Sequence, residues 1–337
     1  MDNFILKEIE KIYKELRSEN EIRAGKRLED IYRKYPELKE IDFSIEHENI
    51  RIALEIAGDG VYRDTSPFKQ ELLKRKKAFI QKNSISEDYY ITKFNCNICK
   101  DTGKNENSTN GKCDCYKKTA YPVLISRCNF ANIENYFFEK IDFSLYSDES
   151  DVKKYRTESS PRTIISGICR ISEKFADNLN FESTRNLFFT GKPGTGKTFI
   201  SGCTAHRAIM NGYSVYYLSA PSFFEKMSNY RVMINSFSPD PERYDTASLS
   251  YNYILNCDLL IIDDLGTEAP NTNRQPDLLS VLNYRTNLNK KMIISTNLEI
   301  NNLSSVFDER VMSRIYGEFS VLRFMGEDLR HKIRQRS

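Results

Sequence analysis

The sequence predicts an α/β protein with a parallel sheet in its C-terminal part and a helical, cysteine-rich part before it. Three observations lead to this prediction: strand and helix patterns alternate in the C-terminal half, a glycine-rich loop occupies residues 191–198, and four cysteines fall within residues 96–115. Alternation of this kind is typical of parallel strands joined by crossover helices. The expected parts are a helical module at residues 1–90, a cysteine segment at residues 91–125 and an α/β domain at residues 126–337.

The composition excludes a membrane protein and a low-complexity chain. Of the 337 residues, 39% are hydrophobic and 29% are charged, and no apolar run approaches the roughly 20 residues that a membrane span needs. The 50 basic and 47 acidic residues give a formal charge of +3, so nucleic-acid contact would depend on local patches. Because no signal-peptide pattern is visible, we expect a cytoplasmic protein whose cysteines are thiols or metal ligands.

The N-terminal part has helical patterns. Apolar residues recur at three- and four-residue steps, which predicts a helix over residues 2–35. A second helical pattern starts near Arg23 and stops at Pro36, because proline breaks a helix interior. Two more helices are expected at Ile45–Ala57 and Lys69–Gln81. Two interpretations remain open: a small helical module with a solvated, charged face, or a module that docks a partner protein.

A cysteine cluster precedes the α/β domain. It consists of a C-x-x-C pair and a C-x-C pair: Cys96, Cys99, Cys113 and Cys115. The surrounding residues are mainly Asn, Gly, Lys and Asp, so apolar packing cannot hold this segment together. Four thiolates suit tetrahedral Zn²⁺, whose binding would supply the folding free energy. Free reduced thiols and an iron–sulfur site are the alternatives, and the C-x-C pair is tighter than the usual C-x-x-C.

A phosphate-binding loop is the most specific motif of the chain. Residues 191–198 read GKPGTGKT and fit G-x-x-x-x-G-K-[ST], between a predicted strand at Asn186–Thr190 and a predicted helix at Lys197–Ile209. Glycines let backbone N–H groups surround the phosphates of ATP, the lysine reaches the β- and γ-phosphates, and the threonine binds Mg²⁺. The expected nucleotide-binding residues are Gly191, Lys192, Pro193, Gly194, Thr195, Gly196, Lys197, Thr198, Phe199 and, farther along the chain, Asp263.

Polar side chains follow two other predicted strands. An acidic pair comes after the apolar run Asp258–Ile262, and we expect Asp263 to hold Mg²⁺ and Asp264 to polarise the attacking water. A helix cap or a solvated charge is the alternative role for Asp264. Asn297 follows the strand Met292–Ser295 and would orient the same water. A further strand is expected at Tyr213–Leu218 and a further helix at Leu278–Leu288.

Three arginines lie beyond these strands. Arg310 and Arg314 are four residues apart and would share one helix face, and Arg330 lies close to the C-terminus. In an oligomeric ATPase, an arginine inserted into a neighbour's site stabilises transition-state charge. A weak surface ion pair is the alternative for each of the three.

Taken together, these motifs resemble the AAA+ ATPases of the DnaC/DnaI helicase-loader and IstB group. The resemblance covers about Phe130 to Arg334. It rests on seven segments: YFFEKIDFSLYSD, the Ser-Pro-Arg at 160–162, GKPGTGKT, IIDDLGTE, ISTNL, ERVMSRI and GEDLR. It implies slow ATP hydrolysis, with Asn297 as sensor 1, Arg314 as an arginine finger acting in a neighbouring copy, and Arg330 as sensor 2. Many AAA+ proteins have Glu where this chain has Asp264.

The resemblance also implies partners. Single-stranded DNA contact is expected from the segment Tyr216–Lys226 with Tyr230 and Arg231, through base stacking and phosphate contacts that a single copy would make only weakly. The alternative interpretation places four apolar side chains of this segment in the core: Tyr216, Leu218, Phe223 and Phe224.

The leading functional interpretation is an ATP-dependent loader of the replicative helicase. Its helical and zinc-bearing part would bind a hexameric helicase of the DnaB type, and its ATPase part would assemble into a homo-oligomer on single-stranded DNA. Two alternatives remain: an IstB-like ATPase that helps DNA transposition, which would be expected to have a shorter N-terminal part without the cysteines, and a nucleotide-gated adaptor that hardly hydrolyses ATP.

Overall fold

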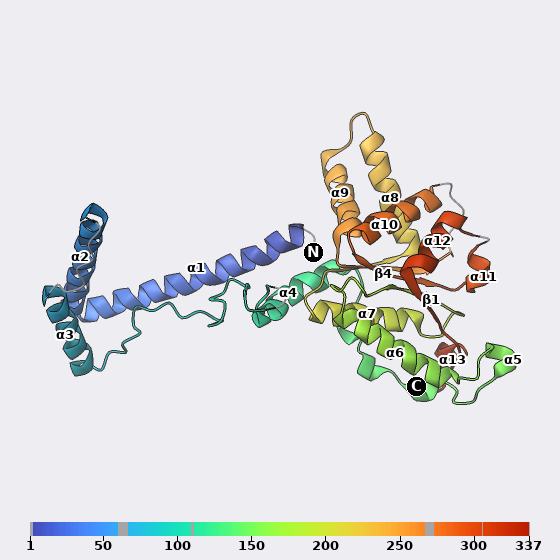
Figure 1. Cartoon of the computed structure of the whole chain (residues 1–337), viewed down its shortest axis with the longest axis horizontal. Coiled ribbons are helices and arrows are strands. Elements are labelled where there is room, and N and C mark those ends of the chain that lie inside the picture. The colour runs from blue at the N-terminus through green and yellow to red at the C-terminus, as the bar shows by residue number, and fades with distance from the viewer. Residues whose placement is uncertain (1–2, 60–66, 109–110, 267–272, 305, 337) are drawn as a thin grey trace. The chain divides into compact units, whose positions relative to one another are not determined.

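The computed structural model describes residues 3–59, 67–108, 111–266, 273–304 and 306–336 (Figure 1). Contacts between residues divide the chain into two compact units, Glu10–Cys113 and Met1–Ile9 with Asp114–Ser337. The boundary at residue 113 falls inside the segment 91–125. The division of the chain at residues 90 and 125 therefore stays a prediction.

The first unit is built from helices. These are α1 (Asn3–Lys34), whose first residues belong to the second unit, α2 (Pro36–Asp59) and α3 (Pro67–Lys82). The expected new start near Arg23 is wrong, because α1 runs unbroken to Lys34 and only Pro36 opens another helix. Leu38, Ile80 and Tyr89 form a small core between these helices and the chain that follows α3.

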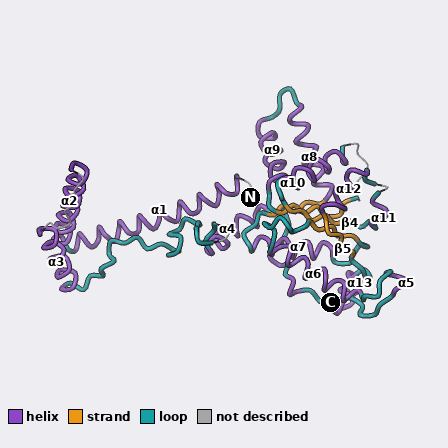
Figure 2. The backbone as a smooth tube through the Cα atoms, in the orientation of Figure 1, coloured by secondary structure: helices purple, strands orange, loops and turns teal. Residues whose placement is uncertain are grey.

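After α3 the first unit continues without long elements. Turns and loops fill most of the stretch from Lys82 to α4 (Asp114–Arg127), as the teal tube of Figure 2 shows. An isolated antiparallel bridge between Lys104 and Lys112 closes one loop within it. This stretch contains three of the four clustered cysteines.

The second unit contains a five-stranded parallel sheet in the order β2-β3-β4-β1-β5. The strands are β1 (Asn186–Thr190), β2 (Val215–Ser219), β3 (Leu259–Leu265), β4 (Lys291–Thr296) and β5 (Phe319–Arg323). The carboxyl ends of β1, β3 and β4 therefore meet at one edge of the sheet, where α/β proteins bind ligands. The predicted α/β class with a parallel sheet is confirmed.

Helices cover both faces of this sheet (Figure 1). The longer ones are α6 (Pro161–Asp177), α7 (Lys197–Met210), α8 (Ala220–Asn235), α9 (Pro241–Asn256), α10 (Arg274–Asn287), α12 (Glu309–Glu318) and α13 (Leu329–Arg336). The short α-helices α5 (Val152–Tyr155) and α11 (Ile300–Leu303) are single turns. The main core lies between the sheet and α8, α9, α10 and α12, while α6 packs on α7. Among the helices of the described ranges, none is long and apolar enough to cross a membrane.

Candidate nucleotide-binding site

The phosphate loop joins β1 to α7, as predicted. Gly191, Gly194 and Gly196 have φ angles of 148°, 74° and 99°, which side chains rarely tolerate. A Cβ on Gly194 would lie 2.0 Å from a carboxylate oxygen of Asp328, and one on Gly191 would lie 2.4 Å from the carbonyl oxygen of Phe324. Backbone conformation therefore favours glycine at all three positions, and close approach of the C-terminal segment adds to this at Gly191 and Gly194.

Lys197 lies at the centre of the loop and is buried, with 4% of its surface exposed. Its Nζ donates hydrogen bonds to the carbonyl oxygens of Gly191 and Lys192, at 2.7 and 2.9 Å, and to Oδ1 of Asn297 at 2.8 Å. Burial lowers the pKa of Lys197 to about 8, although the nearby carboxylates of Asp264 and Asp263 oppose this shift. A buried ammonium held by neutral carbonyls is well suited to a triphosphate, because charge-assisted hydrogen bonds are the stronger ones.

Asp263 is a buried residue of β3 and accepts three side-chain hydrogen bonds. The Thr198 hydroxyl donates to Oδ2 at 2.9 Å, the Tyr217 hydroxyl donates to Oδ2 at 2.8 Å, and the Ser295 hydroxyl donates to Oδ1. The hydroxyl and the carboxylate that we predicted as Mg²⁺ ligands are therefore adjacent. Oxygen donors of these two kinds fit Mg²⁺, which binds few protein groups and completes its shell with phosphate and water.

Asp264 and Asn297 face each other across the ends of β3 and β4. The Asn297 amide donates to Oδ1 of Asp264 at 3.0 Å, and the Asp264 backbone N–H donates to the Ser295 hydroxyl at 3.0 Å. Burial and the neighbouring Asp263 raise the pKa of Asp264. The predicted water-polarising pair thus lies beside Lys197. Thr267 and Glu268, which end the IIDDLGTE motif, lie outside the described residues.

A pocket of about 590 Å³ opens beside the loop. One part of its wall consists of the loop with Asp264, Asn297 and Arg330. The rest is more apolar and comes from the segment 136–146, from Phe199 and from Leu329. A polar part next to an apolar part suits a nucleotide, whose phosphates and nucleoside differ in the same way.

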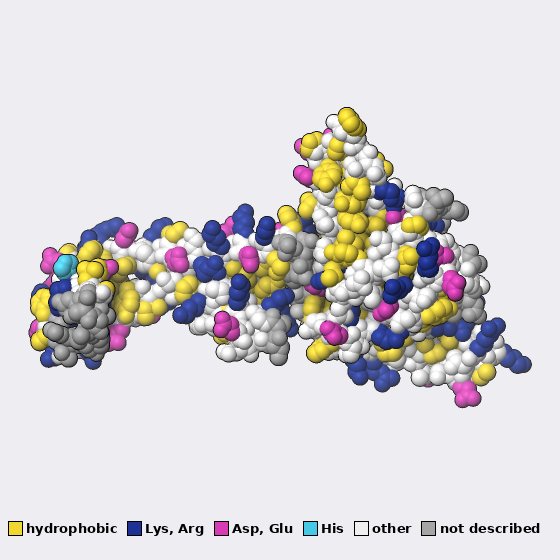
Figure 3. All heavy atoms as spheres, turned by 45° about the horizontal axis from the view of Figure 1, so that its top comes forward, with side chains coloured by type: hydrophobic (Ala, Val, Ile, Leu, Met, Phe, Trp, Pro, Cys, Tyr) yellow, Lys and Arg dark blue, Asp and Glu magenta, His cyan; other side chains and the backbone are white. Residues whose placement is uncertain are grey.

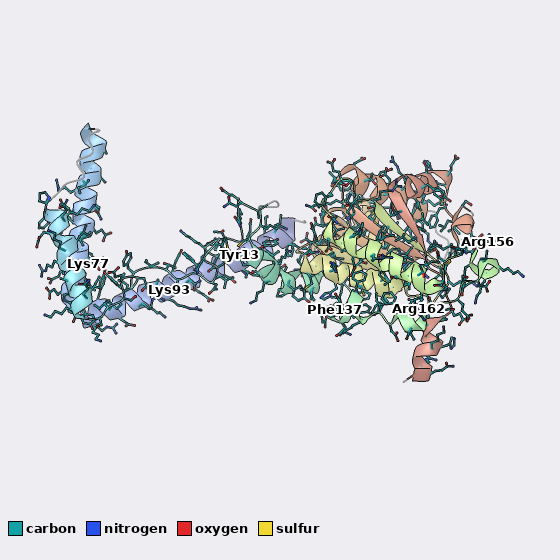
Figure 4. All side chains as sticks on the ribbon, turned by 60° about the horizontal axis from the view of Figure 1, so that its bottom comes forward. Tyr13, Lys77, Lys93, Phe137, Arg156 and Arg162 are labelled. Carbon is teal, nitrogen blue, oxygen red and sulfur yellow. The ribbon has the colours of Figure 1, made fainter. Side chains whose placement is uncertain are left out.

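The segment before α6 is fixed to the loop by residues that the sequence analysis did not assign to the site. Arg162 donates to the carbonyl oxygens of Phe143 and Tyr146, and the Tyr146 hydroxyl donates to the Thr195 carbonyl oxygen at 3.2 Å. Figure 4 labels Arg162, which follows Pro161 in the first turn of α6. The motifs YFFEKIDFSLYSD and Ser-Pro-Arg, on which the family resemblance partly rests, contain these residues and were the available signal.

The three arginines occupy different places. Arg330 lines the pocket, and its Nε lies 3.3 Å from Oδ1 of Asp328. Arg310 and Arg314 lie on α12 and line a separate surface hollow, where Arg314 is 3.9 Å from Glu318. Within one copy, Arg314 is therefore not part of the phosphate pocket, and its assignment as a finger stays a prediction.

The four clustered cysteines come together. Their sulfur atoms all lie within 4.8 Å of one another, and Sγ of Cys96 is 3.7 Å from Sγ of Cys113. Zn–S bonds of about 2.3 Å in a tetrahedron place two sulfurs about 3.8 Å apart, so the donor set fits zinc. The buried Asp101 carboxylate accepts the backbone N–H groups of Asn95 and Cys96, which holds the first pair in a tight turn.

The segment expected to contact DNA is mostly internal. Tyr216, Leu218 and Phe223 are buried, which is the alternative interpretation of these side chains. Tyr230 stacks on Tyr251 with ring centroids 3.9 Å apart, and Arg231 pairs with Asp277. Base stacking on the three buried side chains would therefore require the core to open.

The α8–α9 hairpin has an exposed apolar surface instead. Apolar side chains gather along it in the space-filling view (Figure 3). Exposed members include Val232, Ile234, Phe237 and Leu249. An exposed apolar patch of this kind is typical of an interaction surface.

Comparisons with known proteins also indicate an ATP-binding domain. A sequence model of the family described as IstB-like ATP binding protein matches residues 170–337. The replicative helicase loader DnaC of Buchnera aphidicola subsp. Baizongia pistaciae is 27% identical over 163 residues, which are 48% of this chain and 63% of that protein. The DnaC of Escherichia coli strain K12 is 23% identical over 130 residues, which are 39% of this chain and 49% of that protein.

Solved structures give weaker likenesses. A crystal structure of the DnaC helicase loader has a TM-score of 0.43 at 23% identity and covers 58% of this chain and all of that one. A crystal structure of DnaI has a TM-score of 0.39 at 20% identity, over 56% of this chain and 90% of that one.

The family match contains the phosphate loop, Asp263, Asn297, Arg314 and Arg330, while the cysteine cluster lies outside it. The chain spans less than two thirds of the length of the two DnaC relatives described above. Over residues 170–337, the chain is an ATP-binding domain of the IstB-like family.

Proposed function

We propose that this protein is an ATP-dependent loader of the replicative helicase during the initiation of DNA replication. The observation that carries the proposal is the assembled phosphate site inside a domain whose relatives are named replicative helicase loader DnaC. Those names favour helicase loading over the transposition helper.

ATP would bind with its phosphates in the loop and its nucleoside against the segment 136–146. Lys197 would exchange its carbonyl partners for phosphate oxygens, and Thr198 and Asp263 would hold Mg²⁺, which supplies charge neutralisation when bound. Asp264 and Asn297 would orient the attacking water. Arg330 would contact the phosphates from the pocket wall. We propose slow hydrolysis as the reaction, because a loader needs a timed release and not continuous motion.

The other parts of the chain would bind the partners. The unit Glu10–Cys113 is proposed to dock a hexameric helicase of the DnaB type. Zn²⁺ held by the four cysteines would stabilise it, because the segment around them has little apolar content. The α8–α9 hairpin, with its exposed apolar side chains, supports assembly into a homo-oligomer, and several aligned copies would bind single-stranded DNA better than one copy of charge +3.

The test is complex formation with the replicative helicase of the same cell. Light scattering would give the mass of the mixture with and without ATP. The expected result is a stable complex that is lost when residues 1–113 are removed, which leaves α4 in place. The Lys197→Ala variant serves as the nucleotide control. A full-length chain that assembles with ATP on DNA but leaves the helicase unbound would contradict the loader proposal.

A further inference from the structure

His206 is a buried histidine on α7, the helix that begins with the phosphate loop. Only 3% of its surface is exposed. Both ring nitrogens have partners: Nδ1 lies 3.0 Å from the Tyr136 carbonyl oxygen, and Nε2 lies 3.0 Å from the Tyr121 hydroxyl on α4. None of the roles assigned above uses this residue.

The partners fix the hydrogen positions on the ring. A carbonyl oxygen can only accept, so Nδ1 carries the proton and donates to Tyr136. Nε2 is then the acceptor for the Tyr121 hydroxyl. Burial lowers the pKa of His206, which agrees with a neutral ring, although the Tyr136 carbonyl and the carboxylates of Glu134 and Glu139 oppose the shift.

Tyr136 in turn forms part of the nucleotide pocket. It lines the apolar part of the wall, and its ring lies 5.4 Å from that of Phe199, the residue after Thr198. The ring also approaches the α7 backbone so closely that a Cβ on Gly202 would lie 2.6 Å from Tyr136 Cδ1. The position of the Tyr136 side of the pocket therefore depends on the hydrogen bond between the Tyr136 carbonyl oxygen and His206 on α7.

The neighbouring Phe137 is partly exposed and packs against the histidine. Its ring stands edge-on to the His206 ring, with centroids 4.6 Å apart, and Figure 4 labels it beside the helices of the second unit. The histidine ring is buried, and an apolar replacement would remove the hydrogen bond that the Tyr136 carbonyl oxygen accepts from it.

We propose that His206 is a positioning residue for ATP, which holds Tyr136 against the nucleoside part of the pocket through its Nδ1–H. It would act through Tyr136 and would not touch the phosphates. The inference rests on ATP binding in this pocket and not on helicase loading.

The experiment compares two ligands on the full-length protein with Mg²⁺ present. ATP reports on the whole pocket, whereas inorganic tripolyphosphate reports only on the phosphate loop. His206→Leu removes the donor, and His206→Asn keeps an N–H near the position of Nδ1. We expect His206→Leu to weaken ATP binding by up to about tenfold, the scale of one lost hydrogen bond, with tripolyphosphate affinity unchanged. We expect His206→Asn to restore most of the ATP affinity.

A second variant tests the same wall without touching the histidine. Gly202→Ala stabilises the helix by about 1 kcal/mol, but the added methyl group pushes against the Tyr136 ring. It should therefore also weaken ATP binding and leave tripolyphosphate binding unchanged. Equal weakening of both ligands, or unchanged ATP affinity in His206→Leu and Gly202→Ala, would overturn the positioning role. A wild-type protein that binds tripolyphosphate but not ATP would overturn the inference together with ATP binding, and its complex with the helicase would still be measurable.

Discussion

Asp264 has a backbone conformation that restricts which residues fit there. Its φ of 60° lies in the left-handed region, which Asp and Asn tolerate better than other residues with a side chain. This gives a physical reason for the shorter acidic residue at a position where many AAA+ proteins have Glu. Asn can replace Asp264 without backbone strain, so the substitution tests the contribution of the carboxylate charge alone.

We therefore expect Asp264→Asn to bind ATP like the wild type and to hydrolyse it at least about 100-fold more slowly, the scale of a lost general base. ATP affinity and steady-state phosphate release would be measured on the same preparation. Unchanged phosphate release would contradict the catalytic role and favour the alternative of a helix cap or a solvated charge.

Lys197 makes ATP binding sensitive to pH. Its pKa of about 8 in the empty pocket lies below the ordinary 10.5, so the ammonium loses its proton as pH rises through 8. Bound phosphate favours the charged form, which means that binding takes up a proton above pH 8. ATP affinity should fall between pH 8 and 9 by up to about tenfold, the limit for one linked proton. Calorimetry in two buffers of different ionisation enthalpy measures this uptake.

Lys197→Arg is the matched control, because a guanidinium keeps its charge throughout this range. The affinity of Lys197→Arg for ATP should be lower than that of the wild type but nearly independent of pH between 8 and 9. The same slope in both proteins would show that the linked proton belongs to another group.

The residues of the phosphate site could be predicted to different degrees. Lys197 and Thr198 belong to the loop motif at residues 191–198, and Asp263 follows an apolar strand, so all three were predicted from local sequence. The roles of Tyr217 and Ser295 depend on neighbouring strands that bring their hydroxyls to Asp263. Hydroxyl residues are common in strands, so nothing in the sequence distinguishes these two before the sheet order is known.

At the scale of elements, helices and strands with a strong local pattern could be predicted from the sequence, whereas the pairing of distant strands could not. The strand Asn186–Thr190 was predicted with its observed bounds, because a buried central strand is a short apolar run. The strand β5, whose sequence is FSVLR, was missed, since it lies at the sheet edge beside β1 and is only partly buried. The prediction that a second helix starts near Arg23 was wrong. The sequence around Arg23 is charged and helix-forming on both sides, so α1 continues through it to Lys34.

The cysteine segment gives a prediction for an element with no core of its own. Cys96→Ser removes one of four donors, and we expect it to release Zn²⁺ and unfold the surrounding turns while ATP binding persists. Metal content by mass spectrometry and ATP affinity would be measured together. Cys128→Ser is the control, because this buried cysteine lies outside the cluster. Zinc retained at one ion per chain in Cys96→Ser would contradict the four-cysteine site.

At the scale of the whole molecule, the proposed finger role of Arg314 predicts that one copy is incomplete as an ATPase. This side chain lies on α12 beside Glu318, whereas the phosphates would lie in the pocket around Lys197. An arginine finger supplied by a neighbour would stabilise the transition state by a factor of about 10³ or more. Arg314→Ala should therefore keep ATP affinity and lose the turnover that rises with protein concentration. Arg310→Ala, on the same helix and paired with Asp308, should keep both.

Mixing two inactive variants decides whether Arg314 acts in a neighbouring copy. Lys197→Ala cannot bind ATP but still carries Arg314, and Arg314→Ala binds ATP but lacks the arginine. If the finger acts between copies, the mixture should hydrolyse ATP, because each Arg314→Ala copy can receive the arginine of a Lys197→Ala neighbour. If Arg314 acts within its own copy, no site in the mixture contains both residues and turnover stays absent. Phosphate release from the mixture, compared with each variant alone at the same total concentration, distinguishes the two arrangements.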